Sequence, residues 1–412
     1  MQIRSEELEL LCGDAAQLER LCDGTARPQP WQPFDERVIT YLGRVSRLLL
    51  HDNVAKAYPD VVTFGFFCRA ANVRRLAEAY RTASVQRIGR GLAFHVAPSN
   101  VPINFAYTLV MGLLAGDVCI VKASSKAFVQ TRIVADALSS AMEAMDMADM
   151  CSRVFVVQYG RAQQALTEAF SAVCHVRVIW GGDATIRAVR AADLPPRASD
   201  VTFADRYSLA VLSAAAVREA GKDAKRIQQL AQAFYNDTYL YDQNACSSPR
   251  LIYWLGKEAD VREARARFWA AVHADIKARY PVEPVVAVDK WMAVCRTAIE
   301  VPGATLEPGL DNRIVRLTVP ALGRELQELR SAGGLFHECA AASLDALAAV
   351  LDEKVQTLAY YGLDPAALRA FVIAQGFLGI DRIVPVGRTA EMGTVWDGQD
   401  FIVSLSRIVA TE

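Results

Sequence analysis

The spacing of hydrophobic residues predicts that the first part of the chain is mostly helical. Apolar side chains recur every three or four residues over 36–52 and again over 72–83, as on one face of an amphipathic helix. Pro59 lies between these segments and should stop the first helix before it. The acidic first 24 residues also read as helical. We therefore expect residues 1–85 to be largely helical.

From residue 91 onward the pattern changes to short, continuously apolar runs that alternate with helical segments. Such runs are typical of buried parallel strands when each is followed by a helix. The runs expected to form strands are 91–98, 117–125, 152–160, 176–180 and 201–213. Strand–helix units of about 30 residues predict an α/β, doubly wound parallel sheet. The alternation resumes over 250–375 and predicts a second lobe of the same class.

Three other segments bear on the organisation of the chain. The pair Pro195–Pro196 is typical of a seam between parts of a protein. A long helix is expected over 215–235, leading to a cysteine-containing segment. The last apolar run, 401–409, reads as a final strand.

Composition narrows the class of protein. The chain has 412 residues, of which 52% are hydrophobic, so it can form more than one core and is not disordered. Forty-five basic and 46 acidic residues leave a net charge of −1, which excludes nucleic-acid binding by bulk charge. The sequence contains no uncharged run of 18 apolar residues, so no membrane span is expected. The N-terminus does not resemble a signal peptide. Nine cysteines without a CxxC pair favour a reduced, cytoplasmic chain, and no metal site is expected.

The segment 241–250, Tyr-Asp-Gln-Asn-Ala-Cys-Ser-Ser-Pro-Arg, holds the strongest candidate for chemistry. Cys246 stands among small polar residues after the long helix, so we expect a turn that leaves its thiol accessible. Backbone N–H groups in such a turn favour a thiolate. Most cysteines, however, are inert members of a hydrophobic core. The residues alone leave both interpretations of Cys246 open.

A second candidate follows the apolar run 91–98. Parallel sheets bind ligands at the carboxyl ends of their strands, and Asn100 falls at such an end. Its side-chain amide can donate to an oxyanion that develops during a reaction. Alternatively, Ser99 or Asn100 caps the helix that follows.

Two more segments lie between a strand and a helix. Lys122, Ser124 and Ser125 offer a cation and hydroxyl groups that suit a ribose or a phosphate, although a solvated turn would look the same. Gly181–Gly182 would let the backbone approach a pyrophosphate at a helix N-terminus. This pair is not a GxGxxG motif, so by itself it indicates little.

In this order, the segments resemble the aldehyde dehydrogenase superfamily and, within it, the LuxC-type acyl-CoA reductases. The segments that resemble that branch are 242–250, 58–62 with 67–69, 355–357, 382–387 and 396–398. The similarity covers about residues 30–412. It implies an aldehyde dehydrogenase-like fold of two doubly wound parallel-sheet lobes, with 401–409 as a small C-terminal oligomerisation strand.

The resemblance also implies a division of labour along the chain. Residues 1–205 would hold the N-terminal helices and the dinucleotide-binding domain, and 206–375 the catalytic cysteine domain. Residues 376–412 would return to the cofactor or oligomerisation region. A homo-oligomer is implied, as is usual for the superfamily.

The activity implied is NADPH-dependent reduction of an acyl thioester, carried by CoA or by acyl carrier protein, to an aldehyde. Cys246 would form the acyl-enzyme and Asn100 would contact the oxyanion. The residues that would bind the cofactor are Lys122, Ser124, Ser125, Gly181 and Gly182. Ser125 stands where NAD-preferring members carry a glutamate that repels a 2′-phosphate, and Lys126 adds a cation, so NADPH is expected over NADH.

Two alternatives stay open. The first is oxidation of an aldehyde to the free acid, which needs a base that activates water. The family's glutamate for that step falls on Phe203, so Asp205 or Glu338 would have to replace it. A second family glutamate, which holds the nicotinamide ribose, falls on Gly334. The other alternative is a catalytically inactive homologue in an assembly, against which the presence of the candidate cysteine, asparagine and lysine together argues.

Overall fold

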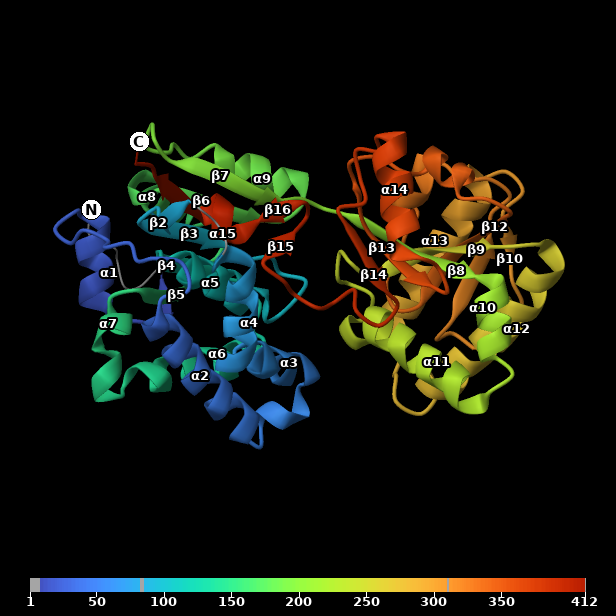
Figure 1. Cartoon of the computed structure of the whole chain (residues 1–412), viewed down its shortest axis with the longest axis horizontal. Helices are drawn as coiled ribbons and strands as arrows, with labels where there is room; N and C mark the ends of the chain where they lie inside the picture. The colour runs from blue at the N-terminus through green and yellow to red at the C-terminus, as the bar shows by residue number, and fades with distance from the viewer. Residues whose placement is uncertain (1–7, 82–84, 310, 412) are drawn as a thin grey trace. The chain divides into compact units, whose positions relative to one another are not determined.

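The computed structural model describes residues 8–81, 85–309 and 311–411. The chain forms two compact units, one of Met1–Ala204 with Met392–Glu412 and one of Asp205–Glu391 (Figure 1). The chain thus leaves the first unit beside the boundary expected at residue 205. It returns at Met392 rather than at residue 376.

The first unit is built on a doubly wound sheet with strand order β1–β5–β4–β3–β6–β7. Strands β3 to β7 pair in parallel, and β1 lies antiparallel to β5 at one edge. The strands of this unit are β1 Glu9–Cys12, β2 Gln86–Gly89, β3 Leu92–Val96, β4 Val118–Ala123, β5 Val154–Gln158, β6 Val176–Trp180, β7 Ser199–Phe203, β15 Val395–Trp396, β16 Gln399–Asp400 and β17 Ser406–Val409.

Helices cover both faces of this sheet (Figure 1). Apolar residues of α1, α8 and α9 pack with strand residues such as Phe94, Ile120 and Phe155 in one core, while α5 contacts β3 and β4 on the sheet. The helices of this unit are α1 Ala15–Cys22, α2 Glu36–His51, α3 Pro59–Phe67, α4 Ala70–Arg81, α5 Asn104–Ala115, α6 Val129–Met142, α7 Ala148–Cys151, α8 Gln164–Val173, α9 Asp183–Arg190 and α15 Phe401–Leu405, with short 3-10 turns η1 Ala55–Ala57 and η2 Met145–Met147.

The second unit repeats the architecture with strand order β10–β11–β12–β9–β8–β13–β14. All neighbours are parallel except the edge pair β10–β11. The strands are β8 Tyr207–Ser213, β9 Pro249–Leu255, β10 Thr305–Leu306, β11 Val315–Thr318, β12 Leu335–Ala341, β13 Val355–Tyr361 and β14 Arg382–Pro385. The helices are α10 Ala214–Ala220, α11 Ala224–Thr238, α12 Glu258–Ile276, α13 Pro284–Glu300 and α14 Pro365–Gln375, with 3-10 turns η3 Tyr239–Tyr241, η4 Arg324–Gln327 and η5 Asp345–Ala349.

Three local predictions are wrong, and in each case the structure supplies the reason. The N-terminal segment was expected to be helical, but residues 9–12 form β1 because they pair with the edge strand β5. The single helix expected over 215–235 is two helices, because α10 ends at Gly221 and Asp223 caps α11 by accepting from the N–H of Lys225 at 2.8 Å.

The last expected strand, 401–409, is only partly a strand. Asp400 accepts a hydrogen bond from the N–H of Val403 and so starts α15, whose buried residues Phe401, Ile402 and Leu405 follow helical spacing. Only β17 is extended, and it pairs antiparallel with β2 of the same chain. The segment expected to serve as an oligomerisation strand therefore pairs, on one edge, within its own unit.

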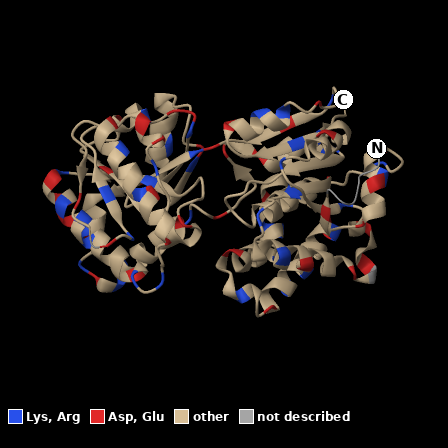
Figure 2. Cartoon of the chain, turned by 180° about the vertical axis from the view of Figure 1, so that it is seen from behind, with Lys and Arg blue, Asp and Glu red and all other residues tan. Residues whose placement is uncertain are grey.

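The distribution of charged residues and the apolar character of the helices agree with the composition of the chain. Figure 2 shows basic and acidic residues interspersed along the helices of both units. Among the described residues, no helix combines the length and the apolar character that a bilayer crossing requires.

Candidate functional site

Cys246 lies in a short turn between η3 and strand β9. Asp242 and Gln243 take left-handed conformations, with φ of 52° and 58°, and reverse the chain after η3. The turn closes where the N–H of Ser248 donates to the carbonyl of Ala245 at 3.0 Å. Cys246 is partly exposed there, whereas most of the other cysteines are buried. The expected turn is therefore present, and Cys246 is partly exposed in it rather than fully buried in the core.

Gln243 fixes this turn to the sheet of the second unit. Its fully buried amide nitrogen donates to the carbonyls of Pro249 at 3.0 Å and Leu335 at 3.1 Å. Its amide oxygen accepts from the N–H of Gly334 at 2.9 Å. Both N–H groups and the oxygen of the amide are thus engaged, so the start of the turn is held against β9 and β12.

Arg250 holds the other end of the segment. Its guanidinium donates to the carbonyl of Gln243 at 2.5 Å and to that of Ser331 at 2.6 Å. Burial lowers the pKa of Arg250 to about 10, the charge of Arg330 adds to this effect, and Cys246 acts in the opposite direction. Arg250 therefore stays charged at neutral pH, and its positive charge attracts a thiolate at Cys246.

The segment before β12 is anchored in turn by α13. The N–H of Gly333 donates to the carbonyl of Asp242 at 3.0 Å. Lys290, buried on the inner face of α13, donates to the carbonyl of Gly333 at 2.7 Å and to that of Asn312. Burial lowers the pKa of Lys290 to about 8. The sequence analysis missed this residue; the available signal was a lysine on the buried side of an otherwise apolar helix.

Ser208 makes the direct contact to the cysteine backbone. Its hydroxyl donates to the carbonyl of Cys246 at 2.7 Å and accepts from the N–H of Thr357 at 3.2 Å. Ser208 lies near the start of β8, and Gln243 contacts the first residues of β9 and β12. The cysteine segment is thus assembled at the amino ends of parallel strands, which the sequence analysis did not specify.

In the first unit, the other candidates lie at the carboxyl edge of the sheet, as their positions after strands predicted. Asn100 follows β3 in an exposed bend. The N-cap residue of α5 is Ile103, which has no side-chain cap hydrogen bond. The alternative in which Ser99 or Asn100 caps this helix is therefore wrong.

Lys122 lies at the end of β4 with its ammonium 4.8 Å from the centre of the Tyr159 ring. Burial lowers the pKa of Lys122, and the charge of Arg161 contributes in the same direction. Among the described residues, no carboxylate contributes to the shift of its pKa. The neighbouring hydroxyl of Ser124 accepts from the N–H of Lys126 at 3.1 Å, whereas Ser125 is exposed. This corner of the sheet thus has excess positive charge. Arg161 contributes to that charge and was not among the residues expected from the sequence.

Gly181 and Gly182 connect β6 to α9, and Gly182 is the N-cap of that helix. A β-carbon at Gly182 would meet no atom within 4 Å, so the approach to the helix N-terminus is open. Asp183, however, places a carboxylate in the first turn and already compensates the helix dipole. The glycine pair leaves room for an anion at the N-terminus of α9, but the carboxylate of Asp183 would repel that anion.

The residues at the positions considered for a water-activating base make other contacts in the structure. Phe203 stacks on Trp180, with ring centres 3.9 Å apart. Glu338 is fully buried and accepts from the indole N–H groups of Trp254 and Trp269, both at 2.8 Å. Asp205 forms an ion pair with Arg330. The alternative roles of Asp205 and Glu338 as a base are therefore not supported.

Gly334, on which the resemblance places a family glutamate, has no room for a side chain. Its φ is 95°, and a β-carbon there would lie 2.0 Å from the carbonyl oxygen of Arg313. Backbone conformation and steric contact both exclude a side chain at this position. The turn that donates a hydrogen bond to Gln243 therefore requires glycine at position 334.

Comparison with known proteins identifies the family to which the chain is similar. The acyl-CoA reductase (LuxC) family model matches residues 72–300, more than half of the chain. A long-chain acyl-protein thioester reductase from Aliivibrio fischeri is 28% identical over 170 residues, 40% of this chain and 32% of that protein. One of the same name from Vibrio harveyi is 27% identical over 175 residues, 42% and 34% of the two chains. The matches therefore span about a third of the length of these relatives.

Solved structures give the fold over nearly the whole chain. The NAD-dependent benzaldehyde dehydrogenase from Corynebacterium glutamicum superposes with a TM-score of 0.61 at 15% identity, covering 99% of this chain and 95% of that one. Lactaldehyde dehydrogenase from Escherichia coli gives a TM-score of 0.59 at 12% identity, covering 96% and 88%. The predicted aldehyde dehydrogenase-like α/β fold is confirmed.

Proposed function

Because the chain belongs to the acyl-CoA reductase (LuxC) family, we propose that it reduces an acyl thioester to an aldehyde through an acyl-enzyme on Cys246. The observation that carries this proposal is the partly exposed Cys246 in a turn held by Gln243, Arg250 and Ser208. The proposed substrate class is supported by two printed names, acyl-CoA reductase for the family and long-chain acyl-protein thioester reductase for the relatives. We propose an acyl group in thioester linkage to CoA or to a carrier protein.

In the first step, the Cys246 thiolate attacks the carbonyl carbon of the thioester. A sulfur–carbon bond forms and the carbonyl electrons move to oxygen. The oxyanion then collapses and expels the CoA or carrier thiolate, which leaves the acyl group on Cys246. The contacts of Arg250 and Ser208 hold the turn and attract the thiolate during this step.

Two N–H donors are proposed for the oxyanion: the Cys246 backbone and the side-chain amide of Asn100. The motif around Asn100 supports this role, and the N-cap position of α5 is taken by Ile103 rather than by Ser99 or Asn100. Loss of one oxyanion donor lowers a rate by about 10²–10³. Asn100→Ala should therefore acylate about that much more slowly than the parent chain.

The residues of the first unit fit a nicotinamide cofactor, and we propose NADPH. Among the described residues, no carboxylate contributes to the pKa shift of Lys122, Arg161 adds positive charge beside it, and Ser125 places no carboxylate there. Lys126, exposed in the same turn, adds a third cation. Such a set favours a 2′-phosphate by charge. When bound, a reduced nicotinamide would supply a hydride to the carbonyl carbon of the acyl-enzyme. Collapse of the resulting thiohemiacetal oxyanion would break the carbon–sulfur bond, releasing the aldehyde and the Cys246 thiolate.

Oxidation to a free acid is disfavoured because a thioester on Cys246 would need a water-activating base. Phe203 cannot accept a proton, and the buried carboxylate of Glu338 is held by the indoles of Trp254 and Trp269 and by two arginine side chains. The acyl-enzyme is therefore protected from hydrolysis until it is reduced.

The test is to incubate the chain with acyl-CoAs of graded length and NADPH, and to measure aldehyde together with the intact mass of the protein. We expect an acyl adduct on the parent chain and none on Cys246→Ala. An adduct that persists in this variant would refute the nucleophile. Neither adduct nor aldehyde would indicate an inactive assembly subunit. Release of free acid from an aldehyde and NADP⁺, without CoA, would indicate the oxidative alternative.

Cofactor choice is tested separately with Ser125→Glu. A carboxylate at this position should repel the 2′-phosphate and shift the preference toward NADH, without loss of the acyl adduct. A parent chain that prefers NADH would contradict the proposed selectivity, though not the acyl-enzyme.

A further inference from the structure

Helix α13 of the second unit carries an apolar outer face. Val285, Val288, Met292 and Ile299 are 65%, 59%, 61% and 82% exposed, and Cys295 is exposed beside them. The opposite face of the helix is anchored: Ala293 and Val294 pack on β11 and β12, and Lys290 and Thr297 are buried. The outer face is thus displayed on a fixed helix.

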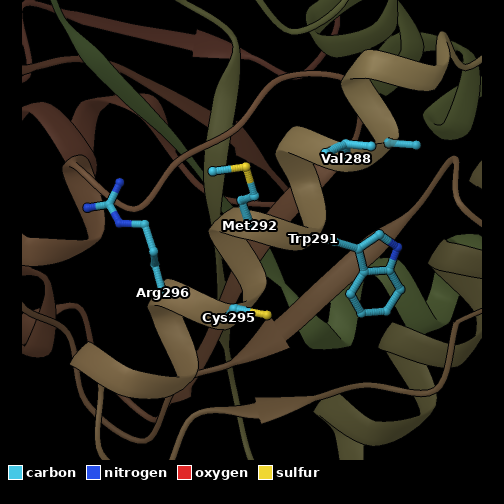
Figure 3. A pocket seen from close by; sticks show the side chains of 6 residues that line it. Val288, Trp291, Met292, Cys295 and Arg296 are labelled. Carbon is cyan, nitrogen blue, oxygen red and sulfur yellow. The ribbon is translucent and has the colours of Figure 1, made fainter.

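The outer residues follow the spacing of a helix-pairing seam. Positions 285, 288, 292, 295 and 299 are separated by three, four, three and four residues. This is the heptad pattern by which one helix packs against another. The same face includes a shallow, open depression lined by Val288, Trp291, Met292, Cys295 and Arg296 of this one helix (Figure 3).

The charges beside the seam indicate which helix fits. Asp289 and Arg296 lie seven residues apart and therefore on the same flank. Figure 3 shows Arg296 and Trp291 pointing to opposite sides of the helix, so the other flank is apolar. In an antiparallel pair of identical helices, like flanks face each other. Asp289 of each copy then faces Arg296 of the other, and the Trp291 flanks meet. A parallel pair would instead set the charges against the apolar flank.

We propose that α13 pairs antiparallel with α13 of a second copy of this chain, around a two-fold axis. A two-fold axis brings the same patch of both subunits together, as this self-complementary face requires. The helix is about 25 Å long, and a stable interface buries about 800 Å² on each partner. The surface around α13 therefore completes the contact. The inference does not depend on the proposed enzymatic activity.

The test is the mass of the full chain in solution by analytical ultracentrifugation, over a wide range of protein concentration. We expect a dimer. Asp289→Arg should set arginine against Arg296 and raise the dissociation constant at least about tenfold. Arg296→Asp should do the same, and the double exchange should restore the parent value. Ile373→Glu, an equally exposed apolar position on α14, should leave the mass unchanged.

Several outcomes would overturn the proposal. A parent chain that stays monomeric, or a dimer that none of the α13 variants weakens, would exclude this pairing. Failure of the double exchange to restore binding, with circular dichroism like that of the parent, would exclude the antiparallel arrangement. A monomer whose α13 binds a different protein would show that the face is not self-complementary.

Discussion

Replacing Gln243 by methionine removes the contacts that hold the cysteine turn while keeping a side chain of similar length. The change breaks two hydrogen bonds from the amide nitrogen and one to the amide oxygen, at 2.9 to 3.1 Å, all buried. At about 1 kcal/mol for each bond, the second unit should lose about 3 kcal/mol of unfolding free energy. Because the turn is then free to shift, and a displacement near 1 Å can cost about 10² in rate, acylation should slow by about that factor.

Urea denaturation measures the stability, and intact mass after mixing with an acyl-CoA measures the rate of acylation per folded molecule. Gln327→Met is the matched control, because Gln327 is also buried and donates to the Val350 carbonyl and the Asp352 carboxylate at 2.9 and 3.0 Å. It should lose about 2 kcal/mol by the same arithmetic and acylate at the parent rate. Equal rates for both variants would refute the claim that Gln243 positions the cysteine.

Three further predictions concern stability and the anchoring of the turn. Burial lowers the pKa of His337 to about 4 and that of His95 to about 3, so only the unfolded state takes up their protons as pH falls below 6.5. The histidine contribution to the unfolding free energy should therefore fall with pH from about 6.5 toward 4, whereas Asp117, whose pKa burial raises to about 8, contributes in the opposite direction. The difference between the parent chain and His337→Phe in urea titrations measures the part due to His337. Lys290 has a folded pKa of about 8, below its ordinary value of 10.5, so its own contribution to stability should rise as pH increases through this interval, while the thiols of Cys12 and Cys22, whose pKa burial raises to about 11, act in the opposite direction. Lys290→Met should abolish that rise and, by releasing Gly333, slow acylation; an unchanged acylation rate would contradict the anchoring role. Glu338→Gln should cost about 1–3 kcal/mol but keep the acylation rate and the product of the folded enzyme, whereas a product changed by this substitution would make Glu338 a participant in the chemistry.

The sequence was sufficient for the overall architecture because buried parallel strands leave a pattern that neighbouring residues carry by themselves. The apolar runs 91–98 and 117–125 contain β3 and β4, and Cys246 lies in the turn its polar neighbours predicted. Local sequence patterns gave wrong predictions where contacts between residues distant in the chain determine the secondary structure. Residues 9–12 are extended only because β5 offers an edge, and Gly221 interrupts a helix whose apolar spacing looked continuous.

What the sequence determined by itself was the presence and order of the strands, the accessible cysteine and the family to which they belong. The tertiary structure alone decided that Gln243, Gly334 and Lys290 act on the same turn, since these residues are separated by many positions along the chain and meet only through the sheet. It also decided that Glu338 belongs to the core, because its indole partners come from β9 and α12. The sequence alone does not show whether a carboxylate is surrounded by water or packed against two tryptophans. Its environment, which sets its chemistry, exists only after folding.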